Sequence, residues 1–410
     1  MGLLSEEFRA AVAKDKDLRM SVEAKMDIGY PTGFPSYDAI TTYPVYINND
    51  AMGIHEKYYC SGIIDGTLNG IIGKTMSGKS TFALQVASNI IRPFKTSCCF
   101  EDSIEGGVTQ SRREILTGFS DLELNERFIV RNQGISAENF YKRIKTIHDI
   151  KIHNKDKYLY DTGFINHMGE PVIIFEPTVY ILDSVALLYP DDMLEDEELK
   201  GGSSMAVSKS VAVVSQLVSA IIPMLKAANI IVLAINHIKD DMNIGPFVKA
   251  PDVKYLKVGE RLPKGKAVTY LSSSIIRIDS GTKLKANETF HIDGSICTIS
   301  NVKSRASAGN RSVPIILNQY TGFDPILSMF QLLKQNGRVN GSGVGLYFDD
   351  YKDYKFSMGN LIDKLNDPAF YEVFSKVAKD EIKRNIIDPK DYQHTSVNNK
   401  FSSDIIGSIK

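Results

Sequence analysis

A glycine-rich segment that carries a lysine and two hydroxyl side chains is the part of this sequence best suited to chemistry. Residues 73–81 read Gly-Lys-Thr-Met-Ser-Gly-Lys-Ser-Thr, the G-x-x-x-x-G-K-S pattern of a phosphate-binding loop. An apolar run over 68–72 precedes the loop, and a helical pattern over 81–87 follows it. Because strand, loop and helix occur in the required order, a chance glycine turn before a buried helix is the weaker explanation.

The side chains of this loop have distinct expected roles. Lys79 neutralises the β- and γ-phosphates of a nucleotide, Ser80 gives its hydroxyl to Mg²⁺, and Thr81 reaches the α-phosphate. The backbone N–H groups at the helix start bind phosphate oxygens. The loop residues predicted to bind ATP are Gly73, Lys74, Thr75, Met76, Ser77, Gly78, Lys79, Ser80 and Thr81.

A second apolar strand offers a carboxylate for the same metal ion. Residues 178–184 read Thr-Val-Tyr-Ile-Leu-Asp-Ser, so that Asp183 stands at the end of the run. A carboxylate held by a rigid strand beside Ser80 is what a Walker B element requires, and oxygen ligands suit Mg²⁺. The alternative is that Asp183 caps a helix that follows the strand. We therefore expect Ser80 and Asp183 to bind Mg²⁺ next to the nucleotide.

Polar residues also follow two other predicted strands. Glu101, Asp102 and Glu105 come directly after an apolar run that ends at Phe100, and one of them is expected to activate the attacking water. The strand predicted over 230–235 ends in Asn236 and His237, which suit a sensor of the γ-phosphate. A solvent-facing start of a loop is the alternative for these two residues.

Composition limits the kinds of protein that this chain can be. Its 410 residues contain 48 Lys and Arg against 49 Asp and Glu, so nucleic acid can be attracted only by a local surface. The four cysteines form no C-x-x-C pair, which argues against a zinc site or a disulfide framework. No uninterrupted apolar run approaches ~18 residues, and the first 20 residues are too charged for a signal peptide. We expect a cytoplasmic protein.

Short apolar strands that alternate with helical patterns predict an α/β fold with a mostly parallel sheet covered on both faces. Helices are expected at 82–91, 138–150 and 205–226, and residues 41–60 are expected to form an insertion or an irregular connection. The strands are expected at 68–72, 96–100, 127–131, 179–182, 230–235, 274–278 and 296–302.

The loop that follows His237 combines basic residues with Phe247, Tyr255 and glycines. Such a loop suits single-stranded DNA, because cations meet phosphates and aromatic rings stack on bases. A loop that is lysine-rich merely because it is solvated is the alternative. An earlier loop at 190–209 is strongly acidic, so DNA binding depends on the later one. The predicted DNA-binding residues of the loop after His237 are Lys239, Lys249, Lys254, Lys257, Arg261, Lys264 and Lys266.

In their order, these segments resemble the RecA-like ATPases and, within them, strand-exchange recombinases of the phage UvsX type. The resemblance covers residues 32–324. Thr-Gly-Phe-Pro-Ser-Tyr-Asp at 32–38 is similar to the family's Thr-Gly-x-x-x-x-Asp segment, and Ala-Ile-Asn-His at 234–237 to a strand end in phage members. Asn-Val-Lys-Ser-Arg at 301–305 resembles an element that reaches a neighbouring subunit, and the run 318–325 resembles the passage out of the core.

The resemblance implies a RecA-like P-loop ATPase core over 61–324, with an oligomerisation segment over 1–60 and a small C-terminal domain over 325–410. Phe-Arg-Ala-Ala at 8–11 has a form that some recombinases use to dock on a neighbouring subunit; packing within the chain is the alternative. His237 takes the γ-phosphate sensor position. Lys303 and Arg305 become cations that act on a neighbour's ATP, unless they are merely solvated cations at a strand end.

The resemblance leaves a choice of catalytic glutamate, because this chain has one residue more than the family's Phe-x-Asp-x-Glu pattern. Glu105 is favoured, and Glu101 and Asp102 stay open. The expected activity is a DNA-dependent ATPase that forms filaments on single-stranded DNA and exchanges strands with homologous duplex DNA. Alternatives are a DnaB-type hexameric helicase, for which the N-terminal segment is short, and a non-enzymatic regulator that binds ATP and, through its acidic loop, a protein partner.

Overall fold

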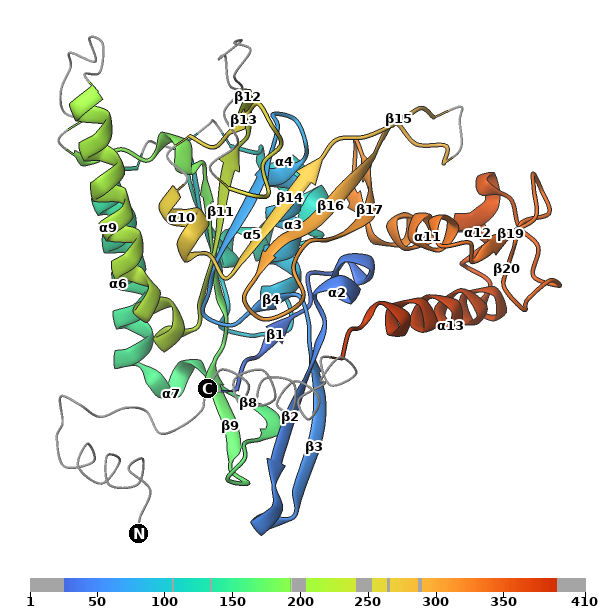
Figure 1. The fold of residues 1–410 in the computed structure, drawn as a ribbon, viewed down its shortest axis with the longest axis horizontal. Coiled ribbons are helices and arrows are strands. Elements are labelled where there is room, and N and C mark those ends of the chain that lie inside the picture. Colours follow the sequence, from blue (N-terminus) through green and yellow to red (C-terminus); the bar gives the residue numbers. More distant parts are fainter. Residues whose placement is uncertain are drawn as a thin grey trace, which may run out of the picture.

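A mostly parallel sheet organises the computed structural model, which describes residues 26–104, 107–132, 135–191, 193, 204–240, 253–263, 266–286 and 290–388. The strand order is β18-β17-β16-β14-β5-β11-β10-β6-β7, with β15 beside β16 (Figure 1). The parallel strands are β5 (Leu68–Gly73), β6 (Cys99–Ser103), β7 (Phe128–Arg131), β10 (Thr178–Asp183), β11 (Ile230–His237) and β14 (Ser274–Asp279). The antiparallel strands are β15 (Lys283–Leu284), β16 (Gly294–Ser304), β17 (Arg311–Asn318) and β18 (Gly322–Asp324).

Helices cover both faces of the sheet because its central strands are apolar on both sides. In β11, Ile231 and Leu233 pack into one core cluster, whereas Ile230 and Val232 pack into another, as the two-residue period of a strand requires. The first cluster also contains residues of α3 (Lys79–Ile91), α4 (Gln110–Thr117) and α5 (Asp121–Arg127). The second contains residues of α6 (Ala137–His153), α9 (Ser204–Ala228) and α10 (Lys266–Leu271) (Figure 1). The predicted α/β class with a mostly parallel central sheet is thus confirmed.

The predicted strands are present, and one of them is displaced along the chain. β6 begins at Cys99 and runs to Ser103, whereas the sequence indicated 96–100. Glu101 and Asp102 therefore lie within the strand and not after it. An apolar pattern does not predict two charged residues inside a strand of the sheet. They are tolerated here because each forms an ion pair: Glu101 with the buried Arg113, and Asp102 with the partly exposed Arg143.

The prediction of an insertion or irregular connection at 41–60 missed a regular element. These residues form a hairpin of β2 (Tyr43–Asn49) and β3 (Ile54–Cys60), joined through a turn in which Gly53 has φ +66°. A second hairpin, β8 (Leu159–Ile165) with β9 (Pro171–Phe175), lies against the first (Figure 1). The rings of Tyr58 and Phe164 stack between them, with centroids 5.0 Å apart.

Smaller elements complete the described chain. α11 (Pro325–Gln335) packs beside β17, and α13 (Pro368–Asn385) packs on α2 (Pro35–Thr41) and α11. Phe330, Phe348 and Phe370 from this C-terminal part belong to the same core cluster as the sheet. These elements are β1 (Gly29–Tyr30), α2 (Pro35–Thr41), β4 (Ile63–Ile64), α7 (Lys155–Tyr158), β12 (Lys239–Asp240), β13 (Glu260–Arg261), α11 (Pro325–Gln335), β19 (Val339–Asn340), β20 (Tyr347–Phe348), α12 (Leu361–Lys364) and α13 (Pro368–Asn385).

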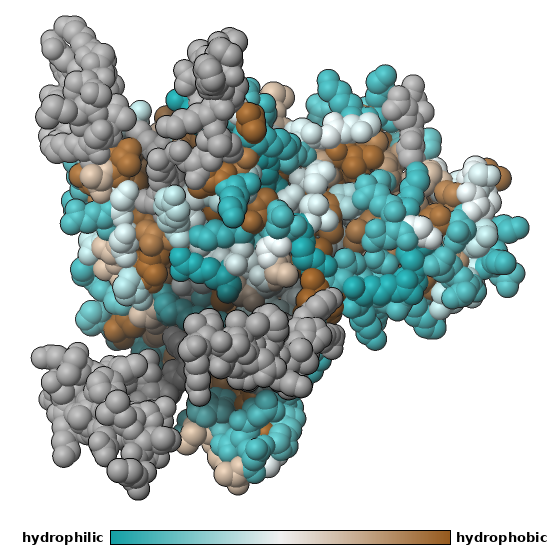
Figure 2. Space-filling view, in the orientation of Figure 1, coloured by the Kyte–Doolittle hydropathy of each residue, from teal (hydrophilic) through white to brown (hydrophobic). Residues whose placement is uncertain are grey.

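Helix α9 is the one helix in the described residues that is long and apolar enough to cross a membrane. Its window Val211–Ala228 has a mean hydropathy of 1.8, and 28% of that window is buried. Figure 2 shows hydrophobic surface interrupted by hydrophilic residues on the left, where α9 lies. Val214, Val218 and Ile221 pack toward α6, so part of this apolar character serves the core.

Candidate nucleotide-binding site

The predicted phosphate-binding loop joins the end of β5 to the start of α3, as the sequence pattern requires. Gly78 precedes the helix with φ +86°, and a Cβ placed there would lie 2.7 Å from the ring of Phe323. A Cβ on Gly73 would lie 2.4 Å from the carbonyl oxygen of Ile278. Both positions therefore require glycine because other parts of the same chain approach closely, and Gly78 is also required by its backbone conformation.

Ser80 and Asp183, the two predicted metal ligands, meet although they lie far apart in the sequence. The Ser80 hydroxyl donates to a carboxylate oxygen of Asp183 over 2.5 Å. Asp183 ends β10, two strands from β5, while Ser80 is in the first turn of α3. A hydroxyl and a carboxylate brought together beside a phosphate loop can both serve as oxygen ligands for Mg²⁺.

The surroundings of the loop also fit a nucleotide phosphate. The Ser77 hydroxyl is buried and has no hydrogen-bond partner among the residues that the structure describes. The Lys79 ammonium is buried and donates to the carbonyl oxygen of Lys74 over 2.8 Å. A helix start has N–H groups without partners inside the helix, so an anion here would meet several donors at once. Together these groups are able to hold a phosphate.

The three candidate bases have different surroundings. Glu101 forms a buried ion pair with Arg113 of α4 over 2.9 Å, and burial raises the pKa of Glu101 while Arg113 opposes that rise. Asp102 accepts hydrogen bonds from Tyr180 and from Arg143 of α6, on the opposite face of β6. Asp102 thus belongs to the α6 side, away from α3 and α4. Glu105 lies outside the described residues.

The predicted sensor lies beside the phosphate loop. His237 is paired in register with Gly73, and the N–H of Ile238 donates to the carbonyl oxygen of Gly73 over 2.9 Å. The side-chain amide of Asn236 donates to the carbonyl oxygen of Pro263 over 3.0 Å. The end of β11 therefore contacts the phosphate loop on one side and the later part of the basic loop on the other.

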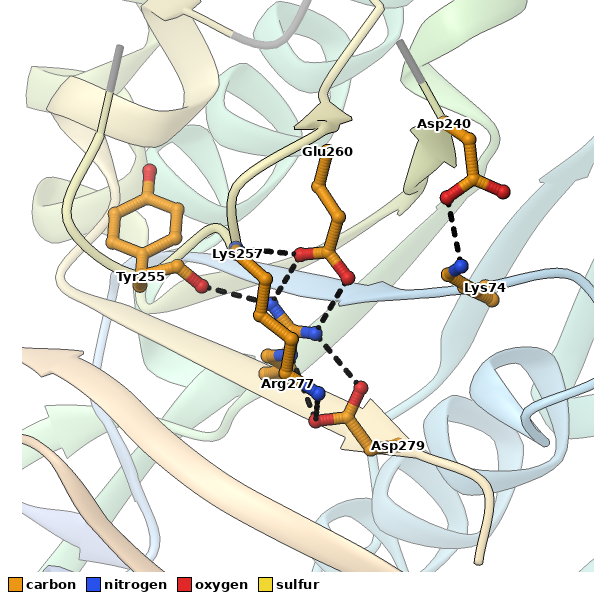
Figure 3. Close-up of polar contacts among 7 residues, drawn as sticks. All are labelled: Lys74, Asp240, Tyr255, Lys257, Glu260, Arg277 and Asp279. Carbon is orange, nitrogen blue, oxygen red and sulfur yellow. Dashed lines mark hydrogen bonds and ion pairs between the residues drawn. The ribbon is translucent and has the colours of Figure 1, made fainter. Parts of the chain in front are cut away.

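Residues 257–260 of the basic loop are fixed to the sheet by ionic contacts. Arg277 of β14 binds Glu260 through two hydrogen bonds of 2.7 and 2.9 Å and also binds Asp279 (Figure 3). The Lys257 ammonium lies 3.6 Å from a carboxylate oxygen of Asp279. Lys257 is therefore engaged in this network, which differs from the simple DNA contact that the sequence suggested.

The other residues predicted to bind DNA are described unevenly. Lys239, Lys254 and Arg261 are exposed, as a contact with a phosphate backbone requires. Lys266 begins α10, and its side chain is not described. Lys249 and Lys264 lie outside the described residues, as do residues 192 and 194–203 of the acidic loop and all of the Phe-Arg-Ala-Ala segment.

Lys303 and Arg305 lie away from the phosphate loop of their own chain. Lys303 is opposite Ile275, which is opposite Gly70, whereas the loop begins at Gly73 at the other end of β5. Both cations donate to the Tyr270 carbonyl oxygen at the end of α10, over 2.9 and 2.8 Å. Within one chain they cap a helix, a use of basic residues that the helix dipole favours.

Two arginines that hold this region together, Arg113 and Arg277, are not among the residues predicted from the sequence. Arg277 carried a signal, because it interrupts the apolar run Ser-Ile-Ile-Arg-Ile-Asp at 274–279 and a charge in a buried strand requires a partner. Arg113 carried no comparable signal, since arginine on a short helix is usually exposed.

Comparison with protein-family models found no match to this chain, and no curated protein matches it. In the described residues no three side chains of His, Cys, Asp or Glu gather as a metal cluster. A magnesium ion that is held by one or two protein oxygens and by substrate phosphates does not require such a cluster. The interpretation of the site therefore rests on its geometry.

Proposed function

We propose that this protein is an ATPase with a RecA-like core. The phosphate loop between β5 and α3, and the meeting of Ser80 with Asp183, support nucleotide binding. The order of the parallel strands supports the RecA-like core, because the phosphate-loop strand is flanked by β14 and by β11, which carries the proposed sensor. The reaction is attack of water on the γ-phosphorus of ATP, with release of ADP and phosphate.

The residues of the chain divide this work among them. Lys79 and the N–H groups of the loop bind and orient the phosphates, so that the γ-phosphorus faces the attacking water. Ser80 and Asp183 would hold Mg²⁺, which neutralises charge on the phosphates when it is bound. Glu101 or Glu105 takes the proton of the water. Asp102 is less suited to this role because it bonds to Tyr180 and Arg143 on the α6 side.

The use of the ATP that we propose is homologous recombination: the protein forms filaments on single-stranded DNA and exchanges strands with homologous duplex DNA. The observation that carries this proposal is the place where β11 ends. Its last residue, His237, lies in register with Gly73 of the phosphate loop, and the chain then continues directly into the basic loop. A change at the γ-phosphate can therefore be passed to a DNA-binding loop through one strand end.

Self-assembly, which a filament requires, is supported at the other end of the sheet. β7 is the terminal strand of the described sheet on that side, and edge strands can pair with another chain. Beside it lies a hollow of about 660 Å³, lined by apolar residues that include Ile129, Ile147 and Ile150 and by the polar residues Arg131, Asn132, Arg143 and Thr146. We propose that Phe8 of a neighbouring copy occupies this hollow.

One experiment tests the activity and the assembly together. The ATPase rate is measured with and without single-stranded DNA, and the same samples are imaged by negative-stain electron microscopy. The proposal expects DNA-stimulated hydrolysis and helical filaments, with both hydrolysis rates lost in Lys79→Ala. Closed rings would favour a hexameric helicase, and binding of ATP without hydrolysis would leave a regulator.

A further inference from the structure

Two ion pairs of opposite character hold the root of the basic loop. The root is the two-residue ladder of β12 with β13, in which Asp240 is opposite Glu260. On the β13 side, Glu260 binds Arg277 of the sheet; on the β12 side, Asp240 binds Lys74 of the phosphate loop over 2.7 Å (Figure 3). The ladder is thus tied to the sheet by one pair and to the nucleotide site by the other.

The Arg277–Glu260 pair is buried and hard to separate, whereas the Lys74–Asp240 pair is exposed and easy to separate. The side chains of Arg277 and Glu260 are 4% and 6% exposed, and separating a buried pair leaves an uncompensated charge. The side chains of Lys74 and Asp240 are 54% and 74% exposed, so water can replace either partner at little cost. A change at the nucleotide site would therefore separate Lys74 from Asp240 while Arg277 holds Glu260.

Lys74 is placed where a terminal phosphate would compete for it. Its carbonyl oxygen accepts the hydrogen bond of Lys79, the residue that would move to the β- and γ-phosphates. Lys74 is also the second residue of the phosphate loop, directly after Gly73, which is in register with His237. A γ-phosphate would bring a new anion close to an ammonium group that now binds a single exposed carboxylate.

We propose that Asp240 competes with the terminal phosphate of the nucleotide for Lys74, and so determines how strongly the site distinguishes a triphosphate from a diphosphate. This inference depends on the nucleotide binding proposed above. When Lys74 turns to the phosphate, β12 loses its tie to the phosphate loop, and the root of the basic loop keeps its anchor on Arg277. Asp240 thereby also links the nucleotide state to the DNA-binding loop.

The first test measures the affinities of the full-length protein for Mg²⁺ with ATPγS and for Mg²⁺ with ADP by calorimetry. Asp240→Asn should tighten ATPγS binding by about two- to fivefold, the range expected when an exposed ion pair no longer has to break. Binding of ADP should change little. In the Lys74→Gln background, Asp240→Asn should have no further effect. Asp353→Asn, which removes an exposed carboxylate from the C-terminal part, is the matched control.

The second test follows the loop itself. The chain contains no tryptophan, so Val258→Trp gives a single reporter at an exposed position between Lys257 and Gly259. ATPγS should change the emission of this tryptophan without DNA. In Val258→Trp/Asp240→Asn, the nucleotide-free protein should already show most of that change.

The possible failures are distinguishable. If neither nucleotide binds to the wild-type protein, the proposed function is wrong and this inference fails with it. If both nucleotides bind but Asp240→Asn strengthens them equally, or acts also in Lys74→Gln, Asp240 exerts only a general electrostatic effect. The inference would then be overturned while the nucleotide-binding proposal stands. An unchanged emission of the introduced tryptophan on addition of ATPγS would overturn the link to the loop.

Discussion

At the scale of single residues, the partners of two acidic side chains inside the sheet determine which of them lies near the candidate site. Glu101 and Asp102 are neighbours in β6, yet they point to opposite faces and bind Arg113 and Arg143, respectively. The two-residue period of a strand imposes this separation. Glu101 therefore lies on the α4 side of the sheet together with Asp183. Burial raises the pKa of Glu101, and the charge of Asp183 adds to that rise.

Arg113→Met should destabilise the protein by about 3–5 kcal/mol, because it leaves the Glu101 carboxylate buried without its partner. The double variant Glu101→Gln/Arg113→Met should recover most of this loss. Urea unfolding of the single and double variants checks the expectation, and additive effects would contradict it. The double variant also tests the base: a stable but inactive ATPase would point to Glu101, and retained activity to Glu105.

Lys151 of α6 gives a second prediction at this scale. Its ammonium is buried and donates to the Glu176 carbonyl oxygen over 2.7 Å, and burial lowers the pKa of Lys151 from 10.5 to about 7. Between pH about 7 and pH 10.5, the unfolded chain holds a proton here that the folded chain has lost. This lysine should therefore make the free energy of unfolding rise with pH, by up to about 1.4 kcal/mol per unit.

Lys151→Met should remove this dependence, which urea unfolding at several pH values above about 7 can measure. Lys145→Met is the control on the same helix, because Asp149 raises the pKa of Lys145 and keeps it charged in that range. Parallel curves for the wild-type protein and Lys151→Met would show that Lys151 stays charged in the fold.

At the scale of elements, Gly78 of the phosphate loop serves both the start of α3 and the packing of α3 against β18. Gly78 sets the entrance of α3 with a left-handed backbone, and Phe323 of β18 lies where its side chain would be. A substitution here therefore acts on the loop and on the packing of α3 against β18 at once.

Gly78→Ala should weaken nucleotide binding by about tenfold or more and cost about 1–2 kcal/mol of stability from the backbone alone. Gly53→Ala is the matched control, since Gly53 also has a positive φ but an added Cβ would meet nothing within 4 Å. It should cost a similar backbone energy and leave nucleotide affinity unchanged. Calorimetry and thermal unfolding measure the two effects; equal affinities in both variants would show that the loop tolerates the side chain.

At the scale of the whole molecule, Lys303 and Arg305 lie apart from the other predicted catalytic residues. Lys303 and Arg305 cap α10 near the end of the sheet opposite the phosphate loop of the same chain. If they stabilise the transferred phosphoryl group, as the family resemblance implies, they do so on the ATP of a neighbouring copy.

A protein that carries Lys303→Ala and Arg305→Ala should keep nucleotide affinity and lose DNA-stimulated hydrolysis. Mixing it with the Lys79→Ala protein should restore part of that activity, because the first keeps intact phosphate loops and the second keeps intact cations. Each protein alone measures the background, and thermal unfolding checks that α10 is still held. A mixture no more active than its components would mean that the cations do not act between copies.

The sequence by itself determined the phosphate loop, the strands around it and the α/β class. These features are local: strand, glycines, lysine and helix lie within one short segment, and the period of apolar residues reports which faces are buried. The position of Asp183 at a strand end was also readable, because parallel strands bring their carboxyl ends to one edge of the sheet.

Only the tertiary structure decided which side chains meet. The place of Glu101 and Asp102 within β6, the partners of Arg277, and the contact of Lys74 with Asp240 all depend on strand order, register and the path of distant loops. No periodicity in the sequence encodes the pairs Glu101–Arg113, Arg277–Glu260 and Lys74–Asp240, since each joins residues of different elements and the energy of the pair is set by its burial. For the same reason, the sequence does not show that Lys257, although basic and exposed, contacts Asp279 of β14 and so belongs to the network that anchors its loop.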